Sequence, residues 1–242
     1  MSCSLVSYYG RKNQSLHTLF HLLQEEIYGY LGNAFHPYLI EQIHGTIIGL
    51  EIERCDDQYF SKWCIHNRED KPPVNLNGLS TYLQKDIPIK FLKFGGFLRE
   101  EKYGFRSWGM HPFERSFSIR GNTLVLNGWP VVKQDGRWEV NPILYEWRSG
   151  LESFSFCHKW HVDGNKDNDL FMVLGRFDKD AVEFGNVERL KMHLQEYLAQ
   201  NELIIPMTRD DVKLVRYKDT ELRPSSTRVH PLSADLVTII PE

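Results

Sequence analysis

Residues 41–53, EQIHGTIIGLEIE, carry a histidine and a threonine two positions apart in an alternating apolar segment. In an extended strand, side chains two apart point to the same face, about 6.6 Å apart along the chain, so His44 and Thr46 would project together. An imidazole with a pKa near about 6.5 exchanges a proton at neutral pH, and a hydroxyl can hold a phosphoryl oxygen. The pair predicts acid–base chemistry on a phosphate; the alternative is a strand with two hydrogen-bonded structural residues.

A second group of reactive side chains lies in FCHKWH, residues 156–161, ahead of an acidic, asparagine-rich segment. A connection of this kind can carry the imidazole of His158 or His161 into a cleft. Lys159 could neutralise a phosphate, and Trp160 could stack on a base. The alternative is a surface loop without a role in binding.

Four further residues are candidates for contacts with phosphate. His111 and Arg115 fall on a connection in WGMHPFERSF, Arg120 follows SFSI, and Arg176 ends the apolar segment LFMVLGRF. Guanidinium groups suit phosphate because they bind its oxygens in pairs. Solvated loop is the alternative for His111 and Arg115.

The four cysteines are too few and too unevenly spaced to predict a disulfide framework in a chain of 242 residues, so we expect thiols. Thiolate and imidazole are the ligands that zinc prefers. A zinc site could be assembled from dispersed residues of these types, but the spacing is not that of a zinc knuckle. The residues are Cys55, Cys64, His66, Cys157, His158 and His161.

Composition restricts the kind of partner. A hydrophobic content of 41% allows a sizeable core, and we expect one domain. A formal net charge of −3 provides no overall field toward nucleic acid, so no DNA-binding surface is indicated and any phosphate site must be local. No apolar run approaches the ~20 residues that span a bilayer, and the first residues do not resemble a signal peptide. We therefore expect no membrane contact and a cytoplasmic location.

The spacing of apolar residues predicts alternating strands and helices. The predicted strands are residues 4–9, 43–53, 87–97, 115–121, 123–131, 170–177 and 212–217, and the predicted helices are residues 13–32, 141–154 and 185–201. Residues 54–86 read as a surface insertion with a short helix at 77–85. Asn186 is placed to cap the helix that follows it, and the C-terminal residues 223–242 are expected to be loop with at most one short element.

This order predicts an α+β or α/β domain with helices packed on a curved sheet. A sequence of strand, helix and glycine-bearing strand occurs before residue 53 and again before residue 177. The repetition predicts a duplicated fold. No low-complexity segment interrupts the chain.

The segment HGTIIGLE, residues 44–51, resembles the HxT/S signature of the two-histidine (2H) phosphoesterases. The resemblance covers roughly residues 4–218. It implies a bilobal, pseudo-duplicated α+β fold, with curved antiparallel sheets, helices packed outside, and two HxT/S strands facing each other across a cleft. It also implies one histidine as general base and one as general acid, with hydroxyls and cations stabilising the phosphoryl charge without a metal or other cofactor. The lobes would be about 1–95 and 110–220 of a single domain, residues 1–242.

The second family motif is not found. Aligning VLGR with the family's TLGR puts Phe171 where the histidine belongs and Val173 where the hydroxyl belongs. Either the second half has lost its catalytic pair, or His158 or His161 supplies the partner of His44.

Three functions remain open. The first is a metal-independent phosphodiesterase that opens a cyclic or 2',5'-linked nucleotide or RNA phosphodiester with His44, Thr46 and His158 or His161. The second is a catalytically reduced module that binds or senses a nucleotide or an RNA end, as the apolar residues at the second motif suggest. The third is a scaffold for protein contacts, which an aromatic content of 13% would suit.

Overall fold

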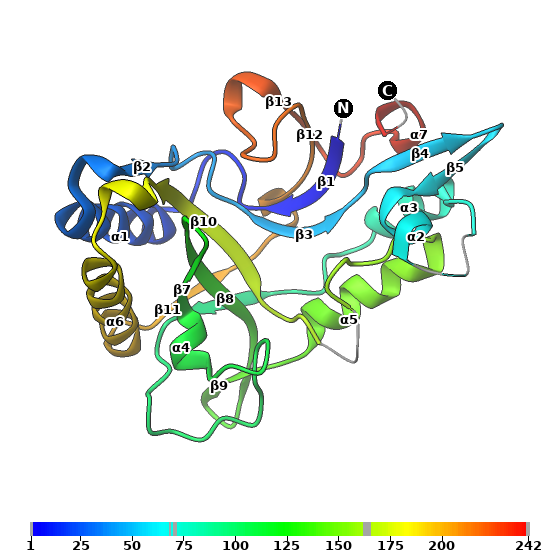
Figure 1. Ribbon diagram of the computed structural model, residues 1–242. Helices are drawn as coiled ribbons and strands as arrows, with labels where there is room; N and C mark the ends of the chain where they lie inside the picture. Colours follow the sequence, from blue (N-terminus) through cyan, green and yellow to red (C-terminus); the bar gives the residue numbers. More distant parts are fainter. Residues whose placement is uncertain (1, 68, 70–71, 162–165, 241–242) are drawn as a thin grey trace.

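The structure is a computed structural model that describes residues 2–67, 69, 72–161 and 166–240 (Figure 1). It is a mixed α+β fold built on antiparallel sheets. The strands are β1 (Ser2–Ser7), β2 (Phe35–Pro37), β3 (Gly45–Gly49), β4 (Ile52–Cys55), β5 (Gln58–Ser61), β6 (Phe91–Phe94), β7 (Phe117–Arg120), β8 (Thr123–Gln134), β9 (Arg137–Val140), β10 (Leu170–Phe177), β11 (Leu203–Pro206), β12 (Val212–Tyr217) and β13 (Thr227–His230). The helices are α1 (Gln14–Leu31), α2 (Lys62–Asn67), α3 (Leu76–Leu83), α4 (Pro112–Ser116), α5 (Ile143–Gly150), α6 (Phe184–Gln200) and α7 (Leu236–Ile239).

The main sheet brings β3 and β10 together at its middle. Its order is β11-β6-β8-β10-β3-β1-β12-β13, whereas β4 and β5 form a separate hairpin. The register between β3 and β10 consists of one antiparallel pair, Gly45 with Met172. A Cβ on Gly45 would lie 2.9 Å from Ser7 Oγ and 3.0 Å from the Leu170 side chain, so this close approach of three strands requires glycine.

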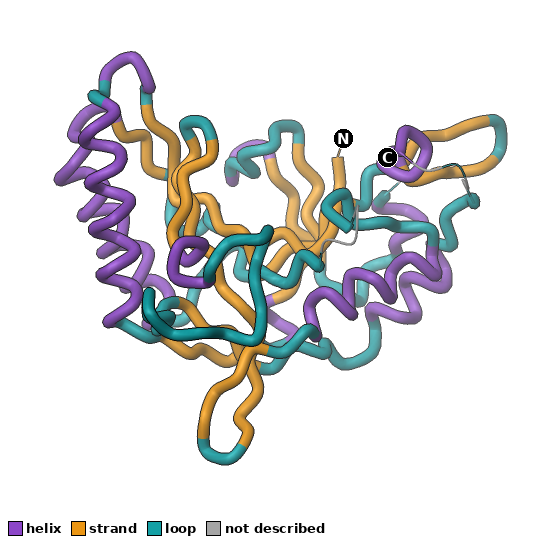
Figure 2. The backbone as a smooth tube through the Cα atoms, turned by 60° about the horizontal axis from the view of Figure 1, so that its bottom comes forward, coloured by secondary structure: helices purple, strands orange, loops and turns teal. Residues whose placement is uncertain are grey.

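One face of the sheet is covered by the two long helices. Figures 1 and 2 both show α1 and α6 side by side at one end of the molecule. The spacing of the apolar residues of α1 buries one of its faces, and that face shares a core with β3, β10 and α6. This core includes Leu16, Leu23, Ile47, Met172, Leu174, Leu190 and Leu194.

The opposite face of the same two strands is lined by different residues. Because side chains alternate along a strand, burying Ile47 and Met172 turns Thr46, Phe171 and Val173 the other way. These three side chains are half-buried and line a cavity together with His44. The side-chain alternation predicted for His44 and Thr46 is therefore observed.

Several predicted elements are confirmed, and two of them agree to the residue. Strands β10 and β12 have the predicted bounds, and α1 ends at Leu31 with Gly32 as its C-cap. Gly32 adopts a φ of 53°, a conformation that favours glycine at the end of a helix. Residues 143–154 form α5 followed by a short 3-10 helix. The helix predicted at 77–85 is α3, one residue earlier at its start.

Other predictions were wrong. Asn186 does not cap α6, because the helix begins at Phe184 and its N-cap is Glu183, without a side-chain hydrogen bond. The strand predicted for residues 43–53 stops at Gly49 and resumes as β4, since β4 leaves the main sheet to pair with β5. The C-terminal segment contains both β13 and α7 rather than at most one element, because β13 pairs with β12 and the apolar face of α7 is buried.

The predicted duplication is not confirmed. In that repeat α5 is the counterpart of α1, yet Figure 1 shows α5 at the opposite end of the molecule from α1. The helix beside α1 is α6, which follows β10 instead of preceding it. In the described part of the chain, no helix has both the length and the apolar character needed to cross a bilayer.

Candidate functional site

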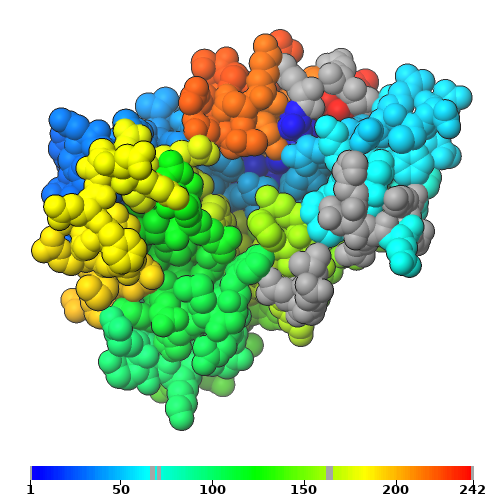
Figure 3. Space-filling model, viewed as in Figure 1, coloured from blue at the N-terminus to red at the C-terminus, as the bar shows by residue number. Residues whose placement is uncertain are grey.

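A cavity of about 490 Å³ opens over the junction of β3 and β10. In Figure 3 this face of the molecule is hollowed where the green, lime and orange segments of the chain meet. The cavity contains eight residues that the sequence singled out: His44, Thr46, Arg115, Arg120, His158, Lys159, Trp160 and Arg176. Segments far apart in the sequence therefore converge here, as the acid–base hypothesis requires.

His44 is held as a neutral base. Its Nδ1 lies 2.7 Å from the carbonyl oxygen of Gln42, and because a carbonyl only accepts, this nitrogen carries the proton and Nε2 keeps its lone pair. Burial lowers the pKa of His44 to about 4, and the nearby ammonium of Lys12 adds to the effect, whereas the hydrogen bond to Gln42 opposes it. At neutral pH the imidazole is therefore uncharged and able to accept a proton.

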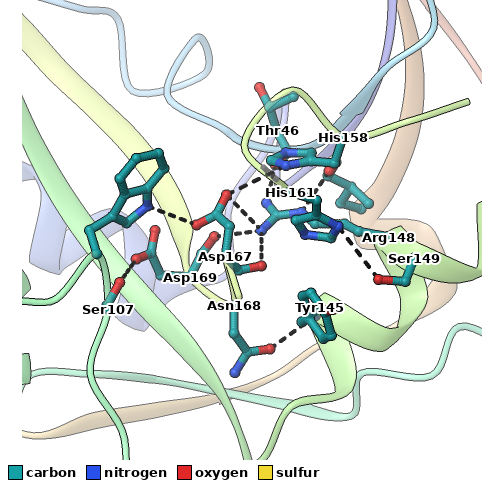
Figure 4. Close-up of polar contacts among 12 residues, drawn as sticks. Thr46, Ser107, Tyr145, Arg148, Ser149, His158, His161, Asp167, Asn168 and Asp169 are labelled. Carbon is teal, nitrogen blue, oxygen red and sulfur yellow. Dashed lines mark hydrogen bonds and ion pairs between the residues drawn. The ribbon is translucent and has the colours of Figure 1, made fainter. Parts of the chain in front are cut away.

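Thr46 is fixed through its backbone by a fully buried arginine. Arg148 Nη2 donates to the carbonyl oxygen of Thr46 at 2.8 Å, and Arg148 Nε donates to that of Ile47 at 2.8 Å. From its other side the same guanidinium donates through Nη1 to the carbonyl oxygens of Asp167 and Asp169, at 3.0 and 3.2 Å (Figure 4). Arg148 thus ties the reactive end of β3 to the residues that lead into β10.

Two buried carboxylates balance two buried guanidinium groups. Asp167 Oδ2 accepts from Arg148 Nη1 at 3.3 Å, and Asp169 pairs with Arg115 at 3.2 and 3.3 Å. The Ser107 hydroxyl donates to Asp169. Burial raises the pKa of Asp167, and the Arg148 charge opposes that rise. The two pairs leave little net charge of their own at the cavity wall.

His158 is the second imidazole in the cavity. Its Nδ1 lies 3.6 Å from Asp167 Oδ2, and within the described residues this nitrogen has no hydrogen-bond partner. Burial lowers the pKa of His158 far below its usual range, and the charges of Arg148 and Lys159 add to the effect. Without a bound anion His158 is therefore neutral, despite the carboxylate beside it.

Two cations of the cavity wall have no salt bridge among the described residues. The Arg120 guanidinium lies over Trp108 at 5.2 Å and over Phe171 at 5.0 Å, and Lys159 lies over Trp160 at 4.8 Å. In the described part of the chain, neither cation has a salt bridge to a carboxylate. Stacking on aromatic faces orients such a group without neutralising it.

Arg176 also lines the cavity, but its guanidinium group already interacts with two other side chains. It lies 3.4 Å from Glu221 Oε1 and donates to the Tyr38 hydroxyl at 3.1 Å. A register shift between Val173 and Gly175 in the pairing of β10 with β8 puts Arg176 on the same face as Val173, which a regular strand would not do.

Three predicted site residues have other surroundings. His111 does not line the cavity; it caps α4, where Nδ1 accepts from the Phe113 amide at 3.2 Å and Nε2 lies 2.8 Å from the Glu101 carbonyl oxygen. Arg115 lines the cavity but is buried in its pair with Asp169. His161 is absent from the lining and packs on His158, with ring centroids 4.9 Å apart.

The zinc hypothesis gains no support from the described residues. Among them, no three His, Cys, Asp or Glu side chains gather closely enough to hold a metal ion. Cys55 is exposed in the β4–β5 hairpin, whereas Cys64 and Cys157 are buried. The side chain of His66 lies outside the described residues.

The sequence pattern did not predict the residues that hold the site together, which are Arg148, Asp167 and Asp169. A signal for the carboxylates exists, because two aspartates two positions apart directly precede the continuous apolar strand β10. Arg148 lies four residues after Leu144 and next to Trp147, on the buried face of α5. A charge on an apolar helix face indicates a buried ion pair.

Comparison with protein-family models and with curated proteins provides no further guide to this cavity. No protein-family model matches the chain, and no curated protein matches it. Its chemistry therefore has to be inferred from the side chains that line it.

Proposed function

We propose that this chain is a phosphodiesterase-like protein that acts on a cyclic or 2',5'-linked phosphodiester of a nucleotide or RNA. The observation that carries the proposal is the single cavity that contains the neutral base His44, the hydroxyl of Thr46, a second imidazole and the cations Arg120 and Lys159. The phosphate would lie over Thr46, and Trp160 would offer a face for the base. The resemblance of HGT to the 2H signature points the same way.

The proposed reaction needs both imidazoles. His44 Nε2 takes a proton from a water molecule as its oxygen attacks phosphorus. The bond from phosphorus to the ribose oxygen breaks, and that oxygen takes a proton from the His158 imidazolium. The carboxylate of Asp167 and the bound phosphate anion favour that imidazolium, whereas burial and Arg148 oppose it. Turnover should therefore be slow and limited by the small fraction of protonated His158.

A second candidate function is binding without turnover. It is favoured by Phe171 and Val173, which take the positions on β10 beside the reactive pair and offer no proton. It is also favoured by the lowered pKa values of His44 and His158, since the ligand-free cavity then holds no imidazolium. A nucleotide would then be held by Arg120 and Lys159 and released unchanged.

We propose that β3 and β10 are the two central strands of a 2H-like fold, each followed in the sheet by further antiparallel strands on its outer side. In such a fold the long helices α1 and α6 would be counterparts. The domain would then have two lobes that meet at the Gly45–Met172 pair.

Binding and turnover are best measured separately on one panel of ligands. The panel contains 2',3'-cyclic and 3',5'-cyclic nucleotides and 2',5'-linked dinucleotides; calorimetry measures affinity, and ³¹P NMR follows the phosphorus product. We expect binding that Arg120→Ala weakens by roughly 10-fold, as for a charge-assisted contact, and that the exposed control Arg137→Ala leaves unchanged. Product formation that requires His44 supports the enzyme; binding without product supports the second candidate. No binding of any member would contradict both.

A further inference from the structure

Two buried cysteines from distant parts of the chain are in contact. Cys64 on α2 and Cys157, in the connection ahead of β10, are separated by 93 positions, yet their sulfur atoms lie 2.7 Å apart. Both side chains are buried. Cys64 Sγ also lies 3.5 Å from the carbonyl oxygen of Ser155.

The distance between the two sulfur atoms is shorter than ordinary packing requires and is close to the length of a covalent bond. A disulfide bond is about 2.05 Å long, so the sulfur atoms need to approach by less than 1 Å. The other two cysteines are differently placed. Cys3 is buried in β1, where burial raises the pKa of its thiol to about 12, and Cys55 is exposed in the β4–β5 hairpin. They serve as internal controls.

We propose that Cys64 and Cys157 are a modification site, a thiol pair that a low-molecular-weight disulfide such as oxidised glutathione converts into a reversible intramolecular disulfide. One protein thiolate attacks the small disulfide and releases one small thiol. The second protein thiolate attacks the resulting mixed disulfide and releases the other small thiol. Two protein thiols are oxidised and one small disulfide is reduced to two thiols.

A disulfide between Cys64 and Cys157 would connect two segments that are distant in the sequence. It would join helix α2, in the segment 54–86, to the residue that directly precedes His158 in the cavity wall. Since the sulfur atoms already touch, the bridge would retain the arrangement of this wall. It would also close a long loop, which restricts the unfolded chain and stabilises the fold. This inference does not depend on the proposed phosphodiesterase function.

Burial also predicts how the bridge forms. The first attack needs contact between a protein sulfur and the small disulfide, and the folded structure shields both sulfur atoms. Reaction of the native protein should therefore be slow. Refolding in a glutathione redox buffer should form the same bridge faster, because both thiols are accessible before the chain packs.

The test is a peptide map of the whole chain after refolding in a glutathione redox buffer and alkylation of the remaining thiols. Tryptic fragments 63–68 and 149–159 carry Cys64 and Cys157, whereas 55–62 and 1–11 carry the control cysteines. We expect a cross-linked pair 63–68 with 149–159, two hydrogens lighter than the sum of the fragments and separated by dithiothreitol. The oxidised protein should melt about 10 °C higher than the reduced protein.

Matched variants complete the test. Cys64→Ser and Cys157→Ser should lose both the cross-link and the shift in melting temperature, while Cys55→Ser should keep both. The map of the unmodified chain decides the proposal even if a variant fails to fold. Alkylation of both Cys64 and Cys157 after refolding would overturn it, and so would a bridge from either to Cys3 or Cys55. Protection of the thiols that EDTA reverses would overturn it too, by indicating a bound metal.

Discussion

The two central strands present opposite chemistry to the same cavity. Strand β3 and the residue before it offer an imidazole and a hydroxyl, His44 and Thr46, while the neighbouring face of β10 offers Phe171 and Val173. The second imidazole comes from His158, which lies in a connection outside the sheet with its Nδ1 3.6 Å from Asp167 Oδ2. The base side of the site therefore lies on the main sheet, whereas the second imidazole lies in a connection beside a buried ion-pair cluster.

Removal of the base His44 is expected to have the largest effect. If the protein is a phosphodiesterase, His44→Ala should lower kcat/KM by roughly 100- to 10,000-fold, the usual contribution of a general base. The control is His17→Ala, an exposed histidine on α1. Rates on the best member of the nucleotide panel measure the effect. Turnover that survives in a folded His44→Ala protein would contradict the role of His44.

The cluster on the other side should matter for stability. Asp169→Ala leaves the buried guanidinium of Arg115 without its carboxylate, which costs about 3–5 kcal/mol of unfolding free energy. The exposed pair of Asp178 with His36 is the control, and Asp178→Ala should cost less than about 1 kcal/mol. Urea unfolding measures both. Equal losses would mean that the cluster is no more important than a surface pair.

The neutral state of His44 predicts a dependence of stability on pH. Its folded pKa is about 4, below the ordinary 6.5, so between these values the unfolded chain binds a proton that the folded chain does not. The contribution is fully present above pH 6.5 and is lost as pH falls toward 4, by up to roughly 3 kcal/mol. Urea unfolding from pH 7.5 to 4.5 should show a shallower fall for His44→Gln. An identical pH profile for the variant would contradict the shift.

Polar side chains can be introduced at the two apolar positions of β10 that line the cavity. The double variant Phe171→His and Val173→Thr places a second pair beside His44 and Thr46, and a strand-borne imidazole should raise turnover by about 10-fold. The matched control is Phe91→His, an exposed phenylalanine on β6. Turnover is measured by ³¹P NMR. A folded double variant without any gain would indicate that β10 is not the counterpart of β3.

Much of the framework could be predicted because local patterns determine it. The apolar spacing of α1 and the continuous apolar run of β10 are properties of short segments, and His44 and Thr46 could be assigned to one face from alternation alone. The side chains that complete the cavity depend on long-range contacts. Arg148 reaches β3 across 102 positions, and no local pattern reports such a contact. The bulge that turns Arg176 into the cavity is likewise a property of pairing with β8.

The ends of several elements could not be predicted either, because they also depend on long-range pairing. Leu50 and Glu51 continue the alternation of β3, yet the strand stops because β4 finds a partner in β5 outside the main sheet. β13 has little apolar character of its own and exists through its pairing with β12. His111 was predicted to contact phosphate because an imidazole can do so. Its role in capping α4 depends on the local turn instead.

The most direct test follows the histidine side chains by ¹H–¹⁵N NMR while a cyclic nucleotide is added. The central claim is that His44 lies in a cavity that binds a phosphate anion. We expect the His44 ring nitrogens to shift and saturate with the ligand, with Nδ1 still protonated through its bond to Gln42, while the exposed His17 does not change. Unchanged His44 signals at saturating ligand, or shifts confined to histidines outside the cavity, would contradict the claim.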